Sequence, residues 1–239
     1  MYYSIIRAIS LLKFQQKEKK LKKYFDILRR CSLFDTIEDQ NLIAMLSCLG
    51  AKRVSFDKKY TISAQGSPAK YFGILLSGSA QVIRYDYYGN RSIVSGVMPG
   101  ELFGESFACA GVPTLPVDII ANEPCEVLLI EGSHVLHTCS NGCDFHRRMI
   151  YNLMRGLAAK NIMFHQKLDI TAKRTTREKL LSYLAYMEQQ TGSDEFEIPF
   201  DRQELADYLE VDRSGLSAEI GKLRREGVID CRKNHFTLL

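Results

Sequence analysis

Three residues that could hydrogen-bond to nucleic acid stand close together near the C-terminus. They are Arg213, Ser214 and Ser217, within the segment FDRQELADYLEVDRSGLSAEIGKLRREGVID. An arginine guanidinium can donate two hydrogen bonds to a guanine edge, and a serine hydroxyl suits either a base or a phosphate. At the start of an exposed helix, this set of side chains would be placed to read a DNA groove. We expect Arg213 to contact bases, with help from Ser214, and Ser217 to contact the backbone.

The pattern around these residues predicts two short helices joined by a tight turn. Asp201 and Glu204 form a capping-box pattern at the start of the first helix, and Asp212 is a plausible N-cap for the second. The turn falls at Glu210-Val211, and Gly227 is placed to end the second helix. The residues expected to face inward are Leu205, Ala206, Leu209, Leu216, Ile220 and Leu223.

Two amphipathic helices joined by a turn occur in many α domains, but two details favour a helix-turn-helix that binds DNA. Ala206 is small where the two helices must cross, and the second helix exposes Arg213 near its N-terminal end. Beyond Gly227, VIDCR and HFTLL around Lys233-Asn234 predict a small hairpin, which would be a wing. Arg202, Gln203 and Asp212 complete the candidate DNA contacts.

The segments that precede the helix-turn-helix differ in the secondary structure that they predict. Residues 24–49 have apolar residues at helical spacing, whereas Ala51 to Ile130 contains short β-rich runs such as YFGILLSGSAQVIRY and CEVLLI. Turn signals separate these runs at Gln65 to Pro68, Asp86 to Asn90 and Pro99-Gly100. Short, closely spaced strands predict an antiparallel barrel or roll.

Residues 144–167 predict an uninterrupted helix about 36 Å long. A helix of this length needs a partner, and a second copy of itself is the simplest one. Gly156, Ala158 and Ala159 would allow close helix approach. The alternative is a long core helix within a monomer. After a hinge at 168–174, Thr175 to Glu178 opens another helix that runs to about Gln190 and ends at Thr191-Gly192-Ser193.

Over residues 22–239 the chain resembles the CRP/FNR family, named for the cyclic-AMP receptor protein and the fumarate–nitrate regulator. The resemblance is carried by Gly66, YFGILLSGSAQV, PGELFGE at 99–105, CEVLLI at 125–130, the long helix and RQELADYLEVDRSGLS. It implies an α+β fold: an N-terminal antiparallel β-roll of the cupin-like jelly-roll, cyclic-nucleotide-binding type, a long dimerisation helix and a C-terminal winged helix-turn-helix. It also implies a homodimer on a pseudo-palindromic site in double-stranded DNA, and contact with RNA polymerase.

In cyclic-nucleotide-binding members of this family, a Glu and an Arg-Ser pair hold the ribose and the phosphate. Gly104 and Glu105 match that pattern, and Ser106 and Phe107 could offer amides, but Leu115-Pro116 occupies the Arg-Ser positions. A buried phosphate without its guanidinium would leave an unpaired charge, and proline removes an amide donor. We therefore expect an unidentified small-molecule effector other than cyclic AMP. Glu105 could equally stabilise the roll, and Lys160 and Asn161 are further pocket candidates by position in the family.

Soft metal ligands concentrate in one stretch. Cys139 and Cys143 lie near His134, His137 and His146, which leaves open a thiol or metal redox switch, although buried cysteines and solvated histidines are the simpler interpretation. Cys31 and Cys48 do not supply the clustered N-terminal cysteines of an iron–sulfur sensor. We predict no metal site and no cofactor.

Composition limits the remaining classes of function. The chain has 239 residues, 46% of them hydrophobic, and its seven cysteines have no CxxC spacing, which favours a reducing cytoplasm. The apolar start MYYSIIRAISLLKF is too short and too interrupted for a membrane anchor or signal peptide. Its Lys-rich continuation could touch nucleic acid or an anionic membrane, but a solvated helix face is the simpler interpretation.

We therefore predict a basic extension at 1–21, a β-roll at 22–143, a dimerisation helix at 144–168 and a DNA-binding domain at 169–239. No nucleophile–base pairing, phosphate loop or HExxH motif points to an enzyme. An effector-binding module whose winged domain contacts proteins remains an alternative, because residues 170–239 carry 11 basic against 13 acidic side chains. Eight basic residues could nevertheless line one side: Lys173, Arg174, Arg177, Arg202, Arg213, Lys222, Arg224 and Arg225.

Overall fold

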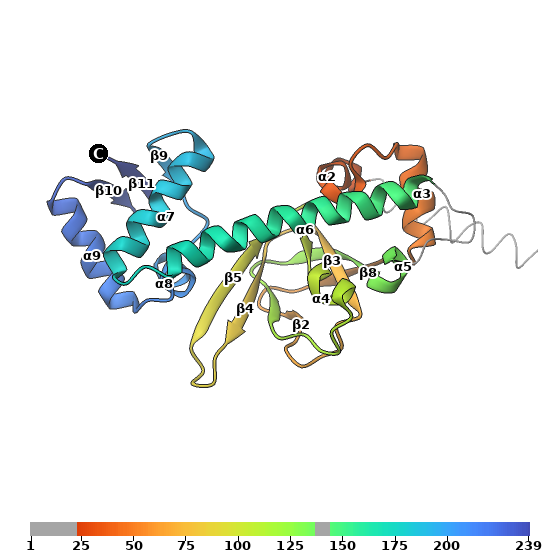
Figure 1. Ribbon diagram of the computed structural model, residues 1–239, viewed down its shortest axis with the longest axis horizontal. Helices are drawn as coiled ribbons and strands as arrows, with labels where there is room; N and C mark the ends of the chain where they lie inside the picture. The colour runs from red at the N-terminus through yellow and green to blue at the C-terminus, as the bar shows by residue number, and fades with distance from the viewer. Residues whose placement is uncertain (1–22, 137–143) are drawn as a thin grey trace, which may run out of the picture. The chain divides into compact units, whose positions relative to one another are not determined.

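The computed structural model describes residues 23–136 and 144–239 (Figure 1). The basic extension at 1–21, together with His137, Cys139 and Cys143, lies outside the described residues. Contacts divide the chain into two compact units. The first contains the described residues up to Val82 together with Gly96–Leu157, and the second contains Ile83–Ser95 and Ala158–Leu239. Each unit is described by itself below.

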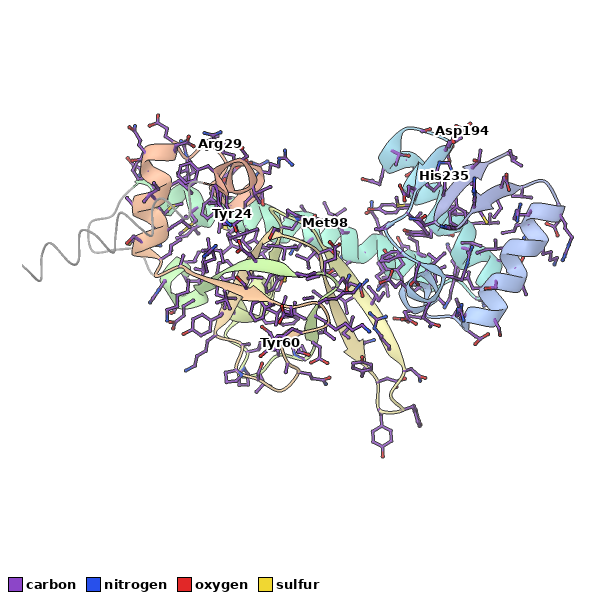
Figure 2. All side chains as sticks on the ribbon, turned by 180° about the vertical axis from the view of Figure 1, so that it is seen from behind. Tyr24, Arg29, Tyr60, Met98, Asp194 and His235 are labelled. Atoms are coloured by element: carbon purple, nitrogen blue, oxygen red, sulfur yellow. The ribbon has the colours of Figure 1, made fainter. Side chains whose placement is uncertain are left out.

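The helical segment predicted at 24–49 is confirmed, but in three pieces. Helix α2 spans Phe25–Arg30, the 3-10 helix η1 spans Ser32–Phe34, and α3 spans Asp39–Cys48. The second interruption, between η1 and α3, contains Thr36, whose φ of 61° lies in the left-handed region that does not continue a right-handed helix. Tyr24 precedes α2 (Figure 2) and is buried. The three pieces bury a shared apolar face that includes Leu28, Leu33 and Leu46.

The predicted antiparallel roll is confirmed as two four-stranded sheets, with orders β1-β8-β3-β6 and β2-β7-β4-β5. Every pairing whose register is defined in them is antiparallel. The strands are β1 Lys52–Phe56, β2 Thr61–Ser63, β3 Tyr71–Ser77, β4 Ala80–Tyr85, β5 Arg91–Val97, β6 Leu102–Phe103, β7 Asp118–Ala121 and β8 Cys125–Glu131.

Strand β3 lies at the centre of the first unit. It pairs with β8 so that Phe72 faces Ile130 and Ile74 faces Leu128, and these residues are fully buried. Because side chains alternate along a strand, Phe72, Ile74 and Leu76 share one face. That face packs into the same apolar cluster as Leu28 and Leu33 from the N-terminal helices. The sheet and the helices therefore share one hydrophobic core.

Two short helices and the first part of a long one complete the first unit. Helix α4 spans Glu105–Ala110, α5 spans Gly132–Leu136, and α6 spans Asp144–Thr171. Helix α6 confirms the long helix predicted at 144–167 and continues four residues further. Asn152 on α6 is buried and donates to the carbonyls of Leu33 and Asp35 at 3.2 and 2.9 Å. These bonds attach the 3-10 helix region to α6.

Besides the end of α6 and parts of β4 and β5, the second unit contains three helices and a three-stranded sheet of order β10-β11-β9. These helices and strands are α7 Thr176–Thr191, β9 Glu195–Glu197, α8 Arg202–Leu209, α9 Arg213–Arg225, β10 Ile229–Arg232 and β11 His235–Leu238. The predicted wing hairpin is confirmed as β10 and β11, joined at Lys233-Asn234. The sequence did not predict β9, which pairs Phe196 with Phe236 on β11. Figure 2 labels His235 on β11 and Asp194 immediately before β9.

Candidate DNA-binding surface and sensor pocket

The first helix of the predicted helix-turn-helix begins with the capping box read from the sequence. The Glu204 amide donates to the Asp201 carboxylate at 2.8 Å, and the Asp201 amide donates to the Glu204 carboxylate at 2.9 Å. Each bond satisfies a backbone donor that the helix itself leaves without a partner. Helix α8 therefore starts at a defined residue, which fixes the direction of the helices that follow.

The turn between α8 and α9 falls at Glu210-Val211, as predicted. Glu210 has a φ of 54°, a left-handed conformation that is uncommon for a residue other than glycine. Lys179 on α7 donates to the carbonyls of Leu209 and Glu210, both at 3.2 Å, and so caps the C-terminal end of α8 with a positive charge. Sequence reasoning missed this role of Lys179, because Lys179 and Glu210 are 31 residues apart.

The second helix begins at Asp212, as predicted. The Gly215 amide donates to the Asp212 carboxylate at 2.8 Å, and the Ser214 hydroxyl donates to the same carboxylate. The Ser214 hydroxyl, and then the Gly215 amide, hold the pKa of Asp212 below its usual range. Asp212 and Ser214 are therefore engaged with each other at the helix start. Arg213 and Ser217, on the first two turns of α9, are exposed.

The inner faces of both helices are buried as the spacing predicted. Ala206 is fully buried, as its small size at a helix crossing suggested. The other predicted inner residues, all buried, are Leu205, Leu209, Leu216, Ile220 and Leu223. Beyond the end of α9, Gly227 has a φ of +70°, the left-handed conformation expected of a residue that ends a helix. In Figure 1, α8 and α9 lie next to each other within this unit.

The remaining DNA-contact candidates lie at the start of α8. Arg202 donates to the Lys233 carbonyl at 3.4 Å, and its guanidinium carbon lies 5.9 Å from the centre of the Phe236 ring. It therefore attaches α8 to the wing. Gln203 is exposed, and its amide nitrogen donates to the Asp207 carboxylate at 2.8 Å. The oxygen of the Gln203 amide is thereby directed away from Asp207.

Two of the eight basic residues in this segment are used in ion pairs within the unit. Arg177 contacts Glu219 at 3.2 Å and Glu226 at 2.6 Å, and the Arg177 guanidinium holds the pKa of Glu226 below its usual range. Arg224 contacts Asp230 at 3.0 Å. The exposed members of the set are Lys173, Arg174, Arg213, Lys222, Arg224 and Arg225. Acidic side chains in this segment are thus partly neutralised, although the net charge of the segment is negative.

Four of the predicted sensor-pocket residues lie at the start of α4. Gly104 has a φ of +76° and precedes α4, and Glu105 is buried with only 3% of its surface exposed. Ser106 is exposed and Phe107 is partly buried. Burial, and secondarily the charge of Glu105, raises the pKa of the Cys109 thiol one turn later. Glu105 thus places a carboxylate inside the roll.

The Leu115-Pro116 segment is held against the early turn by backbone hydrogen bonds. The Leu115 amide donates to Ser67 at 2.9 Å, and the Gly66 amide donates to the Leu115 carbonyl at 2.8 Å. Leu115 is buried and Pro116 is exposed. Lys160 and Asn161, the other pocket candidates, lie on the part of α6 that belongs to the second unit.

Two of the candidate metal-ligating histidines contact backbone carbonyls. His134 Nδ1 lies 3.0 Å from the Leu49 oxygen, and His146 Nε2 lies 3.0 Å from the Val135 oxygen. Within residues 23–136 and 144–239, no group of three or more His, Cys, Asp or Glu side chains could hold a metal ion. Over the same residues, no helix combines the length and apolar character needed to cross a membrane.

Both parts of the chain match known domain families. Residues 53–141 match the cyclic nucleotide-binding domain, and residues 178–239 match the Crp-like helix-turn-helix domain. Together the two matches span more than half of the chain, with the cyclic nucleotide-binding domain before the helix-turn-helix domain. The chain belongs to the CRP/FNR family of DNA-binding transcription regulators. The β-roll, long helix and winged helix-turn-helix expected from the resemblance are confirmed for this CRP/FNR regulator.

Curated relatives of this CRP/FNR regulator include the transcriptional activator FnrL of Cereibacter sphaeroides, 23% identical over 73% of this chain and 71% of FnrL. The nitrogen fixation regulator FixK of Rhizobium meliloti is 25% identical over 65% of this chain and 67% of FixK.

Solved structures share the fold. FixK2 from Bradyrhizobium japonicum covers 79% of this chain and 92% of its own, at 19% identity and a TM-score of 0.62. The c-di-GMP responsive regulator CLP of Xanthomonas campestris covers 84% and 99%, at 18% identity and a TM-score of 0.69.

Proposed function

We propose that this CRP/FNR regulator is a homodimer that binds a pseudo-palindromic DNA site with two copies of α9 and is controlled by a small-molecule effector. The observation that supports this most is the exposed start of α9. Arg213 and Ser217 are exposed on the first turns of a capped helix, where a recognition helix contacts base edges. We assign base contact to Arg213 and backbone contact to Ser217.

The N-cap of α9 limits the DNA contacts that the Ser214 hydroxyl can make. Because the Ser214 hydroxyl donates to Asp212, it must exchange that bond before it can donate to a base. Asp212 supports the helix start as a cap, and its negative charge would repel a phosphate placed beside it. We therefore assign Asp212 an orienting role and rest base recognition on Arg213, with the remaining specificity supplied by DNA shape and dimer symmetry.

The proposal of a homodimer is supported by an exposed apolar face on α6. Tyr151, Met154, Ile162 and Leu168 are large apolar residues that remain exposed on this helix. From Tyr151 to Met154, Ala158 and Ile162 the intervals are three, four and four residues, which is the alternation of a helix–helix seam, whereas Leu168 lies off this line. Such a stripe is expected to be covered by a partner, and a second α6 has a matching stripe.

A symmetric dimer would place two α9 helices in successive major grooves about 34–36 Å apart, which predicts two inverted half-sites. As expected of a transcription regulator of this family, we propose RNA polymerase as the protein partner at promoters.

We propose that the effector is not cyclic AMP. The buried Leu115 and the exposed Pro116 stand where cyclic-nucleotide-binding relatives carry an Arg-Ser pair. Without a guanidinium, a cyclic phosphate held there would be desolvated without a countercharge. The c-di-GMP responsive regulator CLP has the same fold, so the fold accommodates effectors other than cyclic AMP. Calorimetric titration of cyclic AMP should give no binding at micromolar concentrations, and a micromolar dissociation constant would contradict the proposal.

DNA binding is tested with a duplex selected by the wild-type protein from a random pool. Fluorescence anisotropy should show nanomolar binding that weakens steeply from 50 to 200 mM salt, because counterions are released from the phosphates. Arg213→Ala should weaken binding by roughly 10-fold or more, since a bidentate base contact is worth about 1–3 kcal/mol. Arg53→Ala, which removes an arginine paired with Glu126 in the β-roll, is the matched control and should bind normally.

Selection that returns no enriched duplex would favour the alternative in which the winged domain contacts proteins. Equal binding by wild type and Arg213→Ala would contradict the assignment of Arg213 while leaving DNA binding itself intact.

A further inference from the structure

Strands β4 and β5 form a hairpin, distinct from the wing, and Arg91 at the start of β5 forms an ion pair with Asp207 on α8 within the second unit. Arg91 Nη1 donates to Asp207 Oδ2 at 2.7 Å. The two side chains are 31% and 11% exposed, so the pair is more shielded from water than most surface pairs. Arg91 begins β5, and β5 is also a strand of the sheet β2-β7-β4-β5.

Asp207 uses its second carboxylate oxygen to hold Gln203. Gln203 Nε2 donates to Asp207 Oδ1 at 2.8 Å, one helical turn earlier on α8. The carboxylate thus lies between a hairpin arginine and a glutamine that we assign to the DNA-contacting end of α8. A carboxylate with both oxygens engaged has little freedom to rotate, and it fixes which end of the Gln203 amide is presented outward.

Further contacts attach β5 to the same region. The Ser92 hydroxyl donates to the carboxylate of Glu210 at 2.8 Å, at the turn between α8 and α9. Lys167 on α6 donates to the carbonyl of Ile93 on β5, and its ammonium group lies 4.4 Å from the centre of the Tyr208 ring. The β4–β5 hairpin therefore contacts α8 near its C-terminal end and the turn that follows it. Arg213 and Ser217 stay exposed in the presence of these contacts.

We propose that Arg91 is a positioning residue for DNA binding, acting through Asp207 to orient Gln203 and the turn at Glu210. The proposal rests on the DNA-binding function proposed above. In this role Arg91 would act through its contact with Asp207 and would not itself need to contact DNA.

The alternative is an ion pair that contributes only to the stability of this unit. The two interpretations differ in whether loss of the ion pair changes DNA affinity: only a positioning role predicts that Arg91→Ala weakens DNA binding and that Arg91→Lys largely restores it. Arg91 Nη1 donates to one oxygen of Asp207, a contact that a lysine ammonium can also make. They also differ in whether the effects of Arg91 and Gln203 on DNA affinity depend on each other, which a double-mutant cycle measures.

The experiment measures the dissociation constant of the full chain for the wild-type-selected duplex. The variants are Arg91→Ala, Arg91→Lys, Gln203→Ala and the double variant Arg91→Ala/Gln203→Ala, with Arg53→Ala as the matched control. We expect Arg91→Ala to weaken binding roughly 5- to 10-fold and Arg91→Lys to weaken it less than about 2-fold. The double variant should bind no more weakly than the weaker of its two single variants.

Independent effects of Arg91→Ala and Gln203→Ala, or an Arg91→Ala protein that binds as wild type does, would overturn the proposal. A second readout does not need DNA. Amide hydrogen exchange at residues 203–211 should accelerate in Arg91→Ala and stay unchanged in Arg53→Ala. If the wild type selects no duplex, the DNA-binding function fails, while unchanged exchange at 203–211 is the result that refutes the coupling itself.

Discussion

The ammonium group of Lys167 lies against the Tyr208 ring, 4.4 Å from its centre, and donates to the carbonyl of Ile93. Burial lowers the pKa of Lys167 to about 8, while the charge of Glu210 opposes this shift and that of Arg84 adds to it. Burial also raises the pKa of Tyr208 to about 12, so the phenol stays neutral beside the lysine at neutral pH. A positive charge is thus held in a poorly solvated position next to the helix-turn-helix.

The free energy of unfolding should therefore depend on the protonation of Lys167. Between pH 8 and 10.5 the folded chain releases this proton and the unfolded chain keeps it, so unfolding takes up a proton and becomes less favourable as pH rises. Urea unfolding is measured at pH 7.5, 9 and 10.5. Across this range the free energy of unfolding of the wild type should rise by roughly 1–3 kcal/mol relative to that of Lys167→Met. A difference between the two proteins that stays constant with pH would contradict the buried-charge account.

The capping box of α8 gives a second prediction. Asp201→Ala leaves the Glu204 amide without its partner and should lower the free energy of unfolding by about 1 kcal/mol. Asp201→Asn keeps an acceptor oxygen and should lose only a few tenths of that amount. Chemical denaturation monitored by circular dichroism compares the three proteins. Equal losses for Ala and Asn would show that the charge of Asp201, and not the cap, supports the helix.

The β-roll core should reject a side chain at Gly73. An added Cβ would lie 2.0 Å from Cζ of Phe103, so the ring must move. Gly73→Ala should destabilise the fold by about 1–3 kcal/mol, as overpacked cores do, and Phe103→Leu should recover part of the loss in the double variant. Gly96→Ala is the matched control, because its Cβ meets no atom within 4 Å. Thermal unfolding that shows Gly73→Ala to be as stable as Gly96→Ala would contradict this packing.

The α6 seam should determine the oligomeric state. Met154→Glu and Ile162→Glu each place a charge on the proposed helix–helix contact and should raise the dimer dissociation constant at least 10-fold. Light scattering coupled to size-exclusion chromatography would then report monomer at micromolar concentration. Met98→Glu changes another exposed methionine, in the β-roll (Figure 2), and this variant should remain dimeric. A monomeric wild type, or dimeric glutamate variants, would place the interface elsewhere.

Local signals account for the parts of the fold that could be predicted. The N-caps at Thr175, Asp201 and Asp212 bond to amides three residues away, so each is readable from a few letters of sequence. The β-rich run YFGILLS and the uninterrupted helical spacing of 144–167 predicted β3 and α6 for the same reason.

The features that were missed depend on residues far apart in the sequence. Strand β9 has only three residues, and it is a strand because Phe196 pairs with Phe236. The Arg91–Asp207 pair joins positions 116 residues apart, and no spacing rule relates them. The break in the helical segment at Thr36 also lacks a proline or glycine that would have marked it. Tertiary contacts, which a single sequence does not display, decide such features.

The most direct test of the proposed function is the number of chains bound to one selected duplex. Sedimentation velocity with a fluorescent duplex that contains two inverted half-sites should show two chains per duplex, and a duplex with one half-site replaced should bind much more weakly. The two-chain complex should be lost with Arg213→Ala and retained with Arg53→Ala. A complex of one chain per duplex that Arg213→Ala leaves unchanged would contradict the account of a dimer that recognises DNA through α9.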